Sequence, residues 1–343
     1  MTTTATMVYV VIALLPGFVC ANYFYGFGVL WQFGITLGTA IVCELLVCLL
    51  RRRSVSRQMR DYAWLVTALL LSLTLPPLMP WYYTVAACAF AILVAKHCFG
   101  GLGMNIFNPA MTGFVFLMIS APGIFFTTWV TPGYNSHRIA TLETTYGIIF
   151  ELKDSDIMRT QLKLENADFD RISGATYLES IKTARKSGAS EAMEPINFEH
   201  RNYHPYVVMG AAYLLGGLLL LSVRVILFQV PFFFLGTVAL CGFAWNHLDP
   251  NASVNALEHL LFGGTMLAAF FILTDPVTSA GTARGRILFC VLCGLLVVMI
   301  RVEGSYSDSV AFSVLLVNAC APMIDVITKR RPFGAGYIKG GLQ

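Results

Sequence analysis

Residues 170–176, Asp-Arg-Ile-Ser-Gly-Ala-Thr, combine a carboxylate, two small residues and a final hydroxyl. Gly174 and Ala175 have almost no side chain, so the backbone there can turn tightly and a bulky group can approach. The Thr176 hydroxyl is then left accessible. Asp170 offers the hard carboxylate oxygens that divalent metals prefer, and it could also orient a phosphate during a transfer reaction. The motif therefore suggests a threonine that receives a chemical group.

The same residues also fit an ordinary helix start. Ser173 or Thr176 could be the N-cap, and Glu179 lies three residues after Thr176, as a capping box requires. The two interpretations are compatible, because a capped helix can still present an accessible hydroxyl.

The composition of the chain indicates an integral membrane protein. Mean hydropathy is +0.69, 57% of the 343 residues are hydrophobic and 12% are charged, whereas soluble proteins average about 25% charged residues. We expect the chain to contact membrane lipid and not to bind nucleic acid.

Ten apolar runs approach the length of roughly 20 residues that a helix needs to cross a bilayer. They lie at 7–26, 30–50, 62–79, 81–99, 109–130, 205–223, 230–246, 257–274, 286–302 and 309–327. The first run lacks a charged leading region and a small-residue cleavage site, so we expect a retained helix rather than a signal peptide. The predicted fold is an all-α membrane protein with about ten transmembrane helices.

Residues 132–204 form the one long polar segment, with eleven of the nineteen acidic residues. Short loops rich in Lys and Arg tend to remain in the cytoplasm. Such residues follow the second, eighth and tenth runs: Arg51, Arg52, Arg53, Arg57, Arg60, Arg284, Arg286, Lys329, Arg330 and Arg331. We therefore expect both termini in the cytoplasm of a bacterium, the runs in its inner membrane and residues 132–204 in the periplasm. The expected domains are a first transmembrane repeat (1–131), the outer segment (132–204), and a second repeat with a cytoplasmic tail (205–343).

Two halves of the membrane part resemble each other at an offset of 200 residues. Leu73-Thr74 and Pro76 match Leu273-Thr274 and Pro276, and Ala121-Pro122 matches Ala321-Pro322. Five spans per half is an odd number, so the second half must be inverted. Inverted repeats place broken helices at their interface, and residues 100–109 and 302–308 have the composition of such breaks. We expect a cofactor site in the cleft between the halves.

Ionisable residues inside predicted spans are candidates for function because burying their charge in a membrane is costly. Glu44 lies within the second run and is the candidate for ion coupling. Alternatively, it reaches interfacial water or pairs with Lys96 or an arginine. Asp275 and Asp325 lie near the cytoplasmic ends of runs, where helix ends are wet, and Asp275 next to Pro276 fits ordinary turn chemistry. The cysteines Cys290 and Cys293 lie inside a span, where cysteine behaves as a small hydrophobe, and no metal ligand set is predicted.

Several motifs in order resemble the RnfD protein of the Rnf complex, and also the related NqrB protein of the sodium-pumping NADH:quinone reductase. They are residues 170–176, Gly-Gly-Leu-Gly-x-Asn-x-Phe-Asn-Pro-Ala at 100–110, Thr-Asp-Pro-Val-Thr at 274–278, and the stretch from Asp308 to Asp325. The quinone reductase protein has an additional N-terminal stretch before its first span. In this chain the first apolar run begins within about the first ten residues. The RnfD group is therefore the better match.

The resemblance implies a cofactor and partners. In that family a flavin transferase esterifies FMN to the last threonine of the motif, here Thr176, with Asp170, Ser173, Gly174 and Ala175 as the attachment motif. The implied protein is an electron-transfer subunit of a complex that exchanges electrons between ferredoxin and NAD while moving sodium or protons. It is part of an enzyme, without catalytic residues of its own, and its partners are the other proteins of the complex.

The family also makes a second, non-covalent flavin such as riboflavin possible. Gly101 and Gly103 would let the backbone approach a flat ring, and Asn105 and Asn108 could bond its polar edge. Equally, the glycines could serve only helix packing. A flavin-free inverted-repeat transporter or channel is the alternative from a different class, and modification of Thr176 distinguishes the two.

Overall fold

The computed structural model describes residues 2–130, 132–133, 140–150, 204–248, 255–304 and 309–329. Every regular element in this part of the chain is helical. Seven helices are long and apolar enough to cross a membrane, and two shorter apolar helices accompany them. The prediction of an all-α membrane protein is confirmed.

The first half contains the helices that precede residue 131. They are α1 (Thr3–Tyr25), α2 (Gly28–Leu50), α3 (Val55–Met59), α4 (Ala63–Thr74), α5 (Trp81–Ala89), the π-helix η1 (Phe90–Cys98), α6 (Pro109–Ser120) and α7 (Pro122–Thr127). Helix α5 continues directly into η1, and together they form one span. Helix α9 (Leu142–Phe150) follows and packs against α2.

The second half begins at residue 204. Its helices are α12 (His204–Ser222), α13 (Gln229–Leu248), α14 (Ala256–Leu261), α15 (Thr265–Leu267), the π-helix η3 (Ala268–Ile272), α16 (Ala283–Val302) and α17 (Ser309–Thr328).

Three of the ten predicted runs are not single long helices. Run 62–79 forms only the twelve-residue α4, because Pro76 and Pro77 follow it and proline cannot continue the backbone hydrogen bonding of a helix. Run 109–130 is divided at Ala121 into α6 and α7. Run 257–274 is divided by Gly263 and Gly264, both with positive φ.

Pro122 and Pro322, which match at the offset of 200 residues, occupy different positions in their helices. Pro122 occupies the first turn of α7, where its missing N–H is not needed. Pro322 instead lies inside α17, which continues through it to Thr328. The sequence match therefore marks equivalent positions but not identical backbone.

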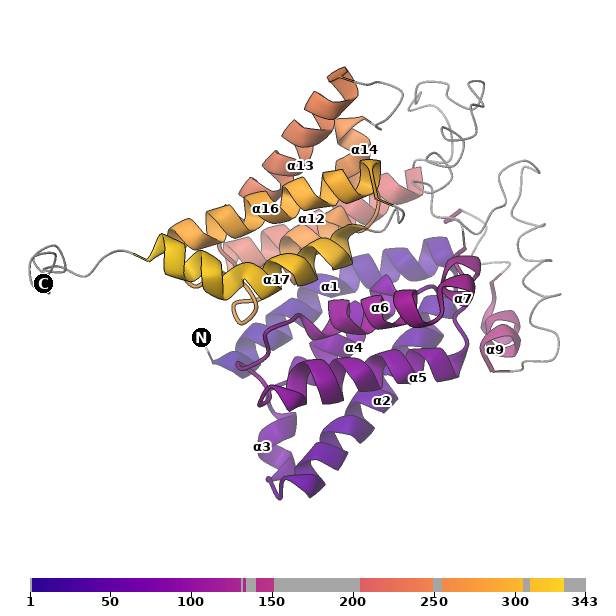
Figure 1. Ribbon diagram of the computed structural model, residues 1–343. Helices are drawn as coiled ribbons and strands as arrows, with labels where there is room; N and C mark the ends of the chain where they lie inside the picture. The colour runs from indigo at the N-terminus through magenta and orange to yellow at the C-terminus, as the bar shows by residue number, and fades with distance from the viewer. Residues whose placement is uncertain are drawn as a thin grey trace, which may run out of the picture.

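The two halves share one packing pattern with opposite direction. In the first half α2 packs against α4 and α5, and α6 against α5 and η1; in the second, α13 packs against α14 and α16, and α17 against α16. Figure 1 shows α1 running away from the N-terminus and α12 running back toward that end of the molecule. The halves meet through the equivalent pairs α1 with α12 and α6 with α17.

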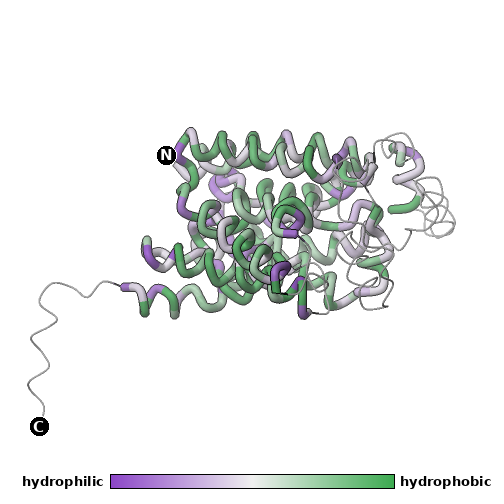
Figure 2. The backbone as a smooth tube through the Cα atoms, turned by 90° about the horizontal axis from the view of Figure 1, so that it is seen from above, coloured by the Kyte–Doolittle hydropathy of each residue, from purple (hydrophilic) through white to green (hydrophobic). Residues whose placement is uncertain are grey.

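The helix bundle has two distinct ends. The basic end carries Arg51, Arg52 and Arg53 after α2, Arg284 and Arg286 at the start of α16, and Lys329 after α17. The loop end carries α7, α9 and the start of α12 (Figure 1). Between the ends the helices are apolar over most of their length (Figure 2). Outward residues such as Leu49, Leu240 and Val326 are 72–76% exposed, as a lipid-facing surface requires.

Candidate functional site

A cavity of about 270 Å³ lies at the basic end, between the two halves. We name it the basic-end cavity. From the first half it is lined by Lys96, Asn105 and Asn108, and from the second by Asp275 and Arg286. Its volume is close to the lower limit of roughly 300 Å³ for typical ligand pockets, and its lining is mainly apolar with a few polar groups. A cavity therefore lies between the halves, and the cofactor expected there stays a prediction.

A glycine-rich turn forms one wall of this cavity. Gly100, Gly101 and Gly103 have φ values of 122°, 108° and 88°, which residues with a Cβ rarely adopt. The turn reverses the chain between η1 and α6 and brings Leu102 and Asn105 to the cavity. Gly101 and Gly103 themselves do not line the cavity, so their role in the structure is to shape the turn.

Asn105 and Asn108 are nearly buried, at 6% and 4% exposed. The Asn105 side-chain nitrogen donates to the Phe107 carbonyl at 3.2 Å, and Asn108 caps α6 by accepting from the Met111 amide at 3.2 Å. In the described part of the chain, the Asn105 amide oxygen and the Asn108 amide nitrogen have no protein hydrogen bond. These two groups would suit the acceptors and donors at the edge of a flat heterocycle.

Asn318 of α17 joins the two halves beside the cavity. With its amide oriented to satisfy both ends, the nitrogen donates to the Thr278 carbonyl at 3.2 Å and the oxygen accepts from the Asn108 amide at 3.1 Å. Asn318 is 1% exposed. The start of α6 in one half and the loop after η3 in the other are therefore held by one side chain.

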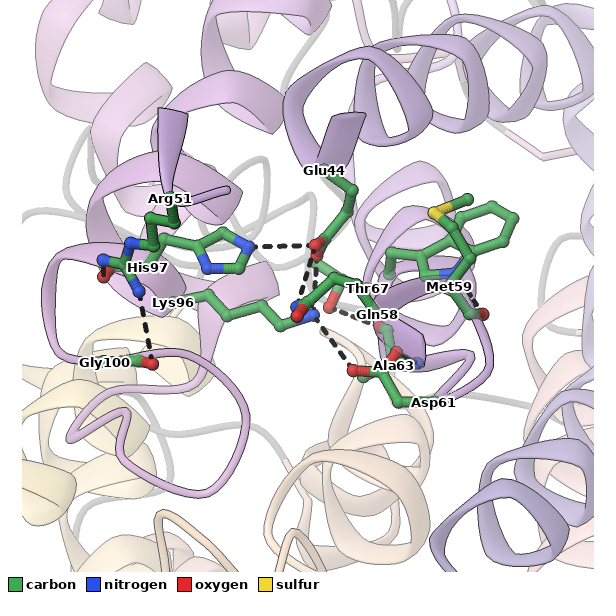
Figure 3. Close-up of polar contacts among 11 residues, drawn as sticks. Glu44, Arg51, Gln58, Met59, Asp61, Ala63, Thr67, Lys96, His97 and Gly100 are labelled. Carbon is green, nitrogen blue, oxygen red and sulfur yellow. Dashed lines mark hydrogen bonds and ion pairs between the residues drawn. The ribbon is translucent and has the colours of Figure 1, made fainter. Parts of the chain in front are cut away.

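A buried ion cluster lies next to the basic-end cavity (Figure 3). The Lys96 ammonium is 2.7 Å from Glu44 Oε1, and His97 Nε2 is 3.0 Å from Glu44 Oε2. Gln58 donates to the same Oε2 at 3.2 Å. Glu44 is fully buried, Lys96 is 1% exposed and His97 is 2% exposed. The expected alternative that Glu44 pairs with Lys96 is confirmed, and an ion-coupling role stays a prediction.

Two further charges border the cluster. Asp61 lies 3.9 Å from the Lys96 ammonium and caps α4 by accepting from the Ala63 amide at 3.0 Å. Burial raises the pKa of the Asp61 carboxyl above its usual value, although Lys96 and the Ala63 amide oppose that rise. Arg51 donates to the His97 and Gly100 carbonyls. These donations tie the end of α2 to the glycine turn.

The π-helix η1 carries both basic residues of the cluster. Lys96 and His97 are consecutive, and consecutive residues of an α-helix point in directions about 100° apart. Here both reach the same carboxylate from a widened helical turn. π-Helical turns are rare and frequently lie at functional sites.

A second cavity, of about 160 Å³, lies at the loop end. We name it the loop-end cavity. Its lining is mainly apolar and includes the aromatic side chains of Tyr25, Trp129, Tyr206 and Phe262. Val130, which follows α7, and Tyr206, in the first turn of α12, also line it.

Arg301 of α16 supports one wall of the loop-end cavity. Its guanidinium donates to the carbonyls of His259, Phe262 and Gly263 at 2.6, 3.1 and 3.2 Å, and to the Thr265 hydroxyl at 2.8 Å. These groups belong to the break between α14 and α15, where a helix end leaves carbonyls without helical partners.

The proposed attachment residues Asp170, Ser173, Gly174, Ala175 and Thr176 lie outside the described residues. The same holds for Asp308 and most of the break at 302–308. The capping alternative for Ser173 or Thr176 with Glu179 also lies there.

Comparison with known proteins gives the family. A sequence model of the NQR2, RnfD, RnfE family matches residues 1–334. The chain belongs to the NQR2, RnfD, RnfE family. A relative from Vibrio cholerae is 39% identical over 334 residues, covering 97% of this chain and 95% of the relative. A Vibrio vulnificus relative is 41% identical (96% and 94% covered), and one from Aeromonas hydrophila is 40% identical (97% and 95%). All three relatives are named as the D component of an ion-translocating oxidoreductase complex.

Membership of the NQR2, RnfD, RnfE family confirms the resemblance inferred from the motifs.

Several residues of the site were not foreseen, namely His97, Gln58, Arg301 and Asn318. His97 and Arg301 had a signal, because each interrupts an apolar run. Asp275 acts as a turn residue, as expected, because it accepts from the Val277 amide. Asp325 instead lies inside α17 and accepts from the Gly281 and Thr282 amides at the start of α16. Cys290 and Cys293 are buried free thiols.

Proposed function

We propose that this chain is a membrane electron-transfer subunit of an ion-translocating ferredoxin:NAD oxidoreductase of the Rnf type, with FMN esterified to Thr176. The observation that carries the proposal is the whole-chain family match together with the unbroken motif at 170–176. A bound FMN exchanges one or two electrons with carriers on neighbouring subunits.

The loop-end cavity is the proposed contact site for the ring of that cofactor. Its aromatic side chains offer stacking surfaces, and its lining includes Val130 and Tyr206, which precede and follow the segment carrying Thr176 in the sequence. Aromatic rings prefer offset or edge-on packing against another ring. In the proposal, Tyr25, Trp129 and Tyr206 orient the ring and exclude water, while Arg301 keeps the cavity wall in place.

The basic-end cavity fits a second, non-covalent flavin such as riboflavin. Asn105 and Asn108 would hold its polar edge through the amide groups that lack protein partners in the described chain.

The proposed orientation of the protein in the membrane follows from its basic residues. The basic end faces the cytoplasm of a bacterium, and the loop end faces the periplasm. Glu44 is the proposed ion-coupling residue, and the assembly partners are the other proteins of the complex, the flavin transferase and lipid.

The covalent cofactor is tested on the denatured chain, expressed in cells that contain the flavin transferase. We expect a fluorescent band whose mass includes one FMN, and loss of both in Thr176→Ala. Thr183→Ala, in the same segment, is the control and should retain the flavin. A dark wild-type band of unmodified mass would overturn the redox assignment and favour a flavin-free transporter.

The second flavin is tested by extracting non-covalent flavin from the purified complex. We expect one riboflavin-type molecule in the wild type and several-fold less in Asn105→Ala. Asn246→Ala is the control, because Asn246 lies on α13 and bonds Asn255 away from the cavity. Equal flavin content in both variants would contradict the assignment of the basic-end cavity.

A further inference from the structure

Lys96 is shared by two neighbouring sites. Its side chain lines the basic-end cavity, and its ammonium contacts the buried carboxylate of Glu44 at 2.7 Å and approaches that of Asp61 at 3.9 Å. Lysine is a point charge on a flexible four-carbon stem, so it can move its charge by rotating single bonds. The same charge therefore acts on the cavity and on the carboxylates.

The other charges around the cavity are fixed by contacts of their own. Asp275 accepts from the Val277 amide and the Thr278 hydroxyl, and Arg286 donates to the Gly281 carbonyl at 3.2 Å. Arg51 is tied to carbonyls of the glycine turn. His97 contacts Glu44 but does not line the cavity. Among the described residues, Lys96 is thus the cavity-lining cation that also contacts Glu44.

Glu44 keeps two partners if Lys96 moves. Gln58 and His97 both contact Oε2, whereas Oε1 is the atom that Lys96 occupies. Removing the ammonium from Oε1 would leave a buried carboxylate with an open lone pair, and a buried charge that loses its partner is strongly disfavoured. Binding of a proton or a small monovalent cation at Oε1 would restore neutrality.

We propose that Lys96 couples charge in the basic-end cavity to cation occupancy of Glu44. The proposal rests on the proposed flavin in that cavity, and the electron comes from the redox partners of the complex. An electron taken up by a flavin held in the cavity would attract the Lys96 ammonium away from Glu44 Oε1. One proton or sodium ion from the water at the basic end then binds Oε1, so one negative charge is matched by one positive charge. Loss of the electron reverses both movements.

The test is infrared difference spectroscopy of the whole complex in its membrane, oxidised against reduced. In the wild type we expect a reduction-dependent signal from Glu44, assigned by its loss in Glu44→Gln. Proton uptake gives a carboxylic-acid C=O band. Sodium uptake instead gives a sodium-dependent shift of the carboxylate bands. Absence of any Glu44 signal would overturn the proposal.

Variants of Lys96 separate coupling from simple stability. Lys96→Met should abolish the Glu44 signal, because Glu44 without its ammonium is neutral in both redox states. Lys96→Arg should retain a signal. Arg284→Met is the control, since Arg284 is an exposed cation at the same end of the bundle that does not line the cavity, and it should keep the signal. A full Glu44 signal in Lys96→Met, or its loss in Arg284→Met, would contradict the role given to Lys96.

Two measurements keep the outcomes distinguishable. If Lys96→Met does not assemble, the double variant Lys96→Met/Glu44→Gln is used, because it removes both charges. The redox titration of its flavin should then lack the dependence on pH or sodium concentration that the wild type shows. Retention of that dependence would overturn the coupling. Extracted flavin is measured in every sample: a complex without non-covalent flavin overturns the proposed ligand and this coupling together, whereas flavin present with an unchanged Glu44 signal overturns the coupling alone.

Discussion

At the scale of single residues, Glu44 and Lys96 form a pair whose members depend on each other. Both side chains are almost completely removed from solvent. Breaking a buried pair by removing one partner leaves an uncompensated charge, whereas removing both charges is far better tolerated. The buried cluster therefore contributes to stability only as a complete set.

Replacing Glu44 by alanine should lower the free energy of unfolding by roughly 3–5 kcal/mol, because Lys96 loses its close carboxylate. The midpoint of denaturation of the purified complex in detergent is the measurement. Glu44→Gln/Lys96→Met should recover much of the loss. Glu143→Gln, an acidic residue on the exposed surface of α9, is the control and should change little. Equal stability of Glu44→Ala and wild type would contradict the contacts described for the cluster.

Asn108 combines a capping role with a proposed ligand role, and two substitutions separate them. Asn108→Ser retains an N-cap oxygen for α6 but removes the amide, so stability should change little while extracted flavin falls. Asn108→Ala removes both, and loss of an N-cap costs about 1 kcal/mol. Thermal unfolding and flavin content of the two variants are the measurements. Unchanged flavin in Asn108→Ser would remove Asn108 from the proposed ligand site.

At the scale of elements, breaks in helices are stabilised by arginines from neighbouring helices. Arg51 binds carbonyls at the end of η1, and Arg301 binds carbonyls between α14 and α15. Helix ends leave carbonyls without intrahelical partners, and in a membrane water cannot replace those partners. Each cavity thus borders a break that an arginine holds in place.

Arg301→Met should destabilise the protein by about 3 kcal/mol or more, since several buried acceptors lose a charged donor worth roughly 1.5–3 kcal/mol each. Arg301→Lys should recover only part, because an ammonium lacks the planar fork of donors. Thermal unfolding of the complex measures the effect. Arg57→Met, on the exposed surface of α3, serves as the control. Wild-type stability in Arg301→Met would show that the wall of the loop-end cavity does not depend on the guanidinium.

At the scale of the whole molecule, the two halves are joined by close backbone contact between α1 and α12. A Cβ at Gly216 would collide with the Ala13 carbonyl oxygen, and one at Gly17 would collide with the Tyr213 ring. Small residues at such positions allow membrane helices to approach closely. Both cavities lie between the halves, so their shapes depend on this approach.

Gly216→Ala should separate α1 from α12 and cost about 1–3 kcal/mol, as overpacking does in well-packed interiors. Gly236→Ala is the matched control: Gly236 is also helical, but a Cβ there meets no atom within 4 Å. The control should be neutral or more stable by up to about 1 kcal/mol, because alanine is the better helix former. The thermal midpoint and the content of extracted flavin are the measurements. Equal behaviour of the two variants would contradict the tight interface.

The sequence by itself determined the class of the protein, the positions of the apolar runs, the family and the chemical identity of the candidate residues. Those properties depend on composition, on the length of hydrophobic runs and on short motifs, all of which can be recognised without knowing which residues meet in space. It also indicated Lys96 as a partner for Glu44, because an intramembrane carboxylate requires a counter-charge.

Only the tertiary structure decided which residues meet. Asn318 and Asn108 lie 210 positions apart, and Arg301 reaches carbonyls some forty residues earlier in the chain. The division of run 257–274 and the π-helical turns of η1 and η3 likewise depend on packing, since short apolar runs have the same composition whether or not the helix is continuous. Lys96 lines a cavity and contacts a buried carboxylate at once because the inverted halves place those sites next to each other, an arrangement that no local pattern encodes.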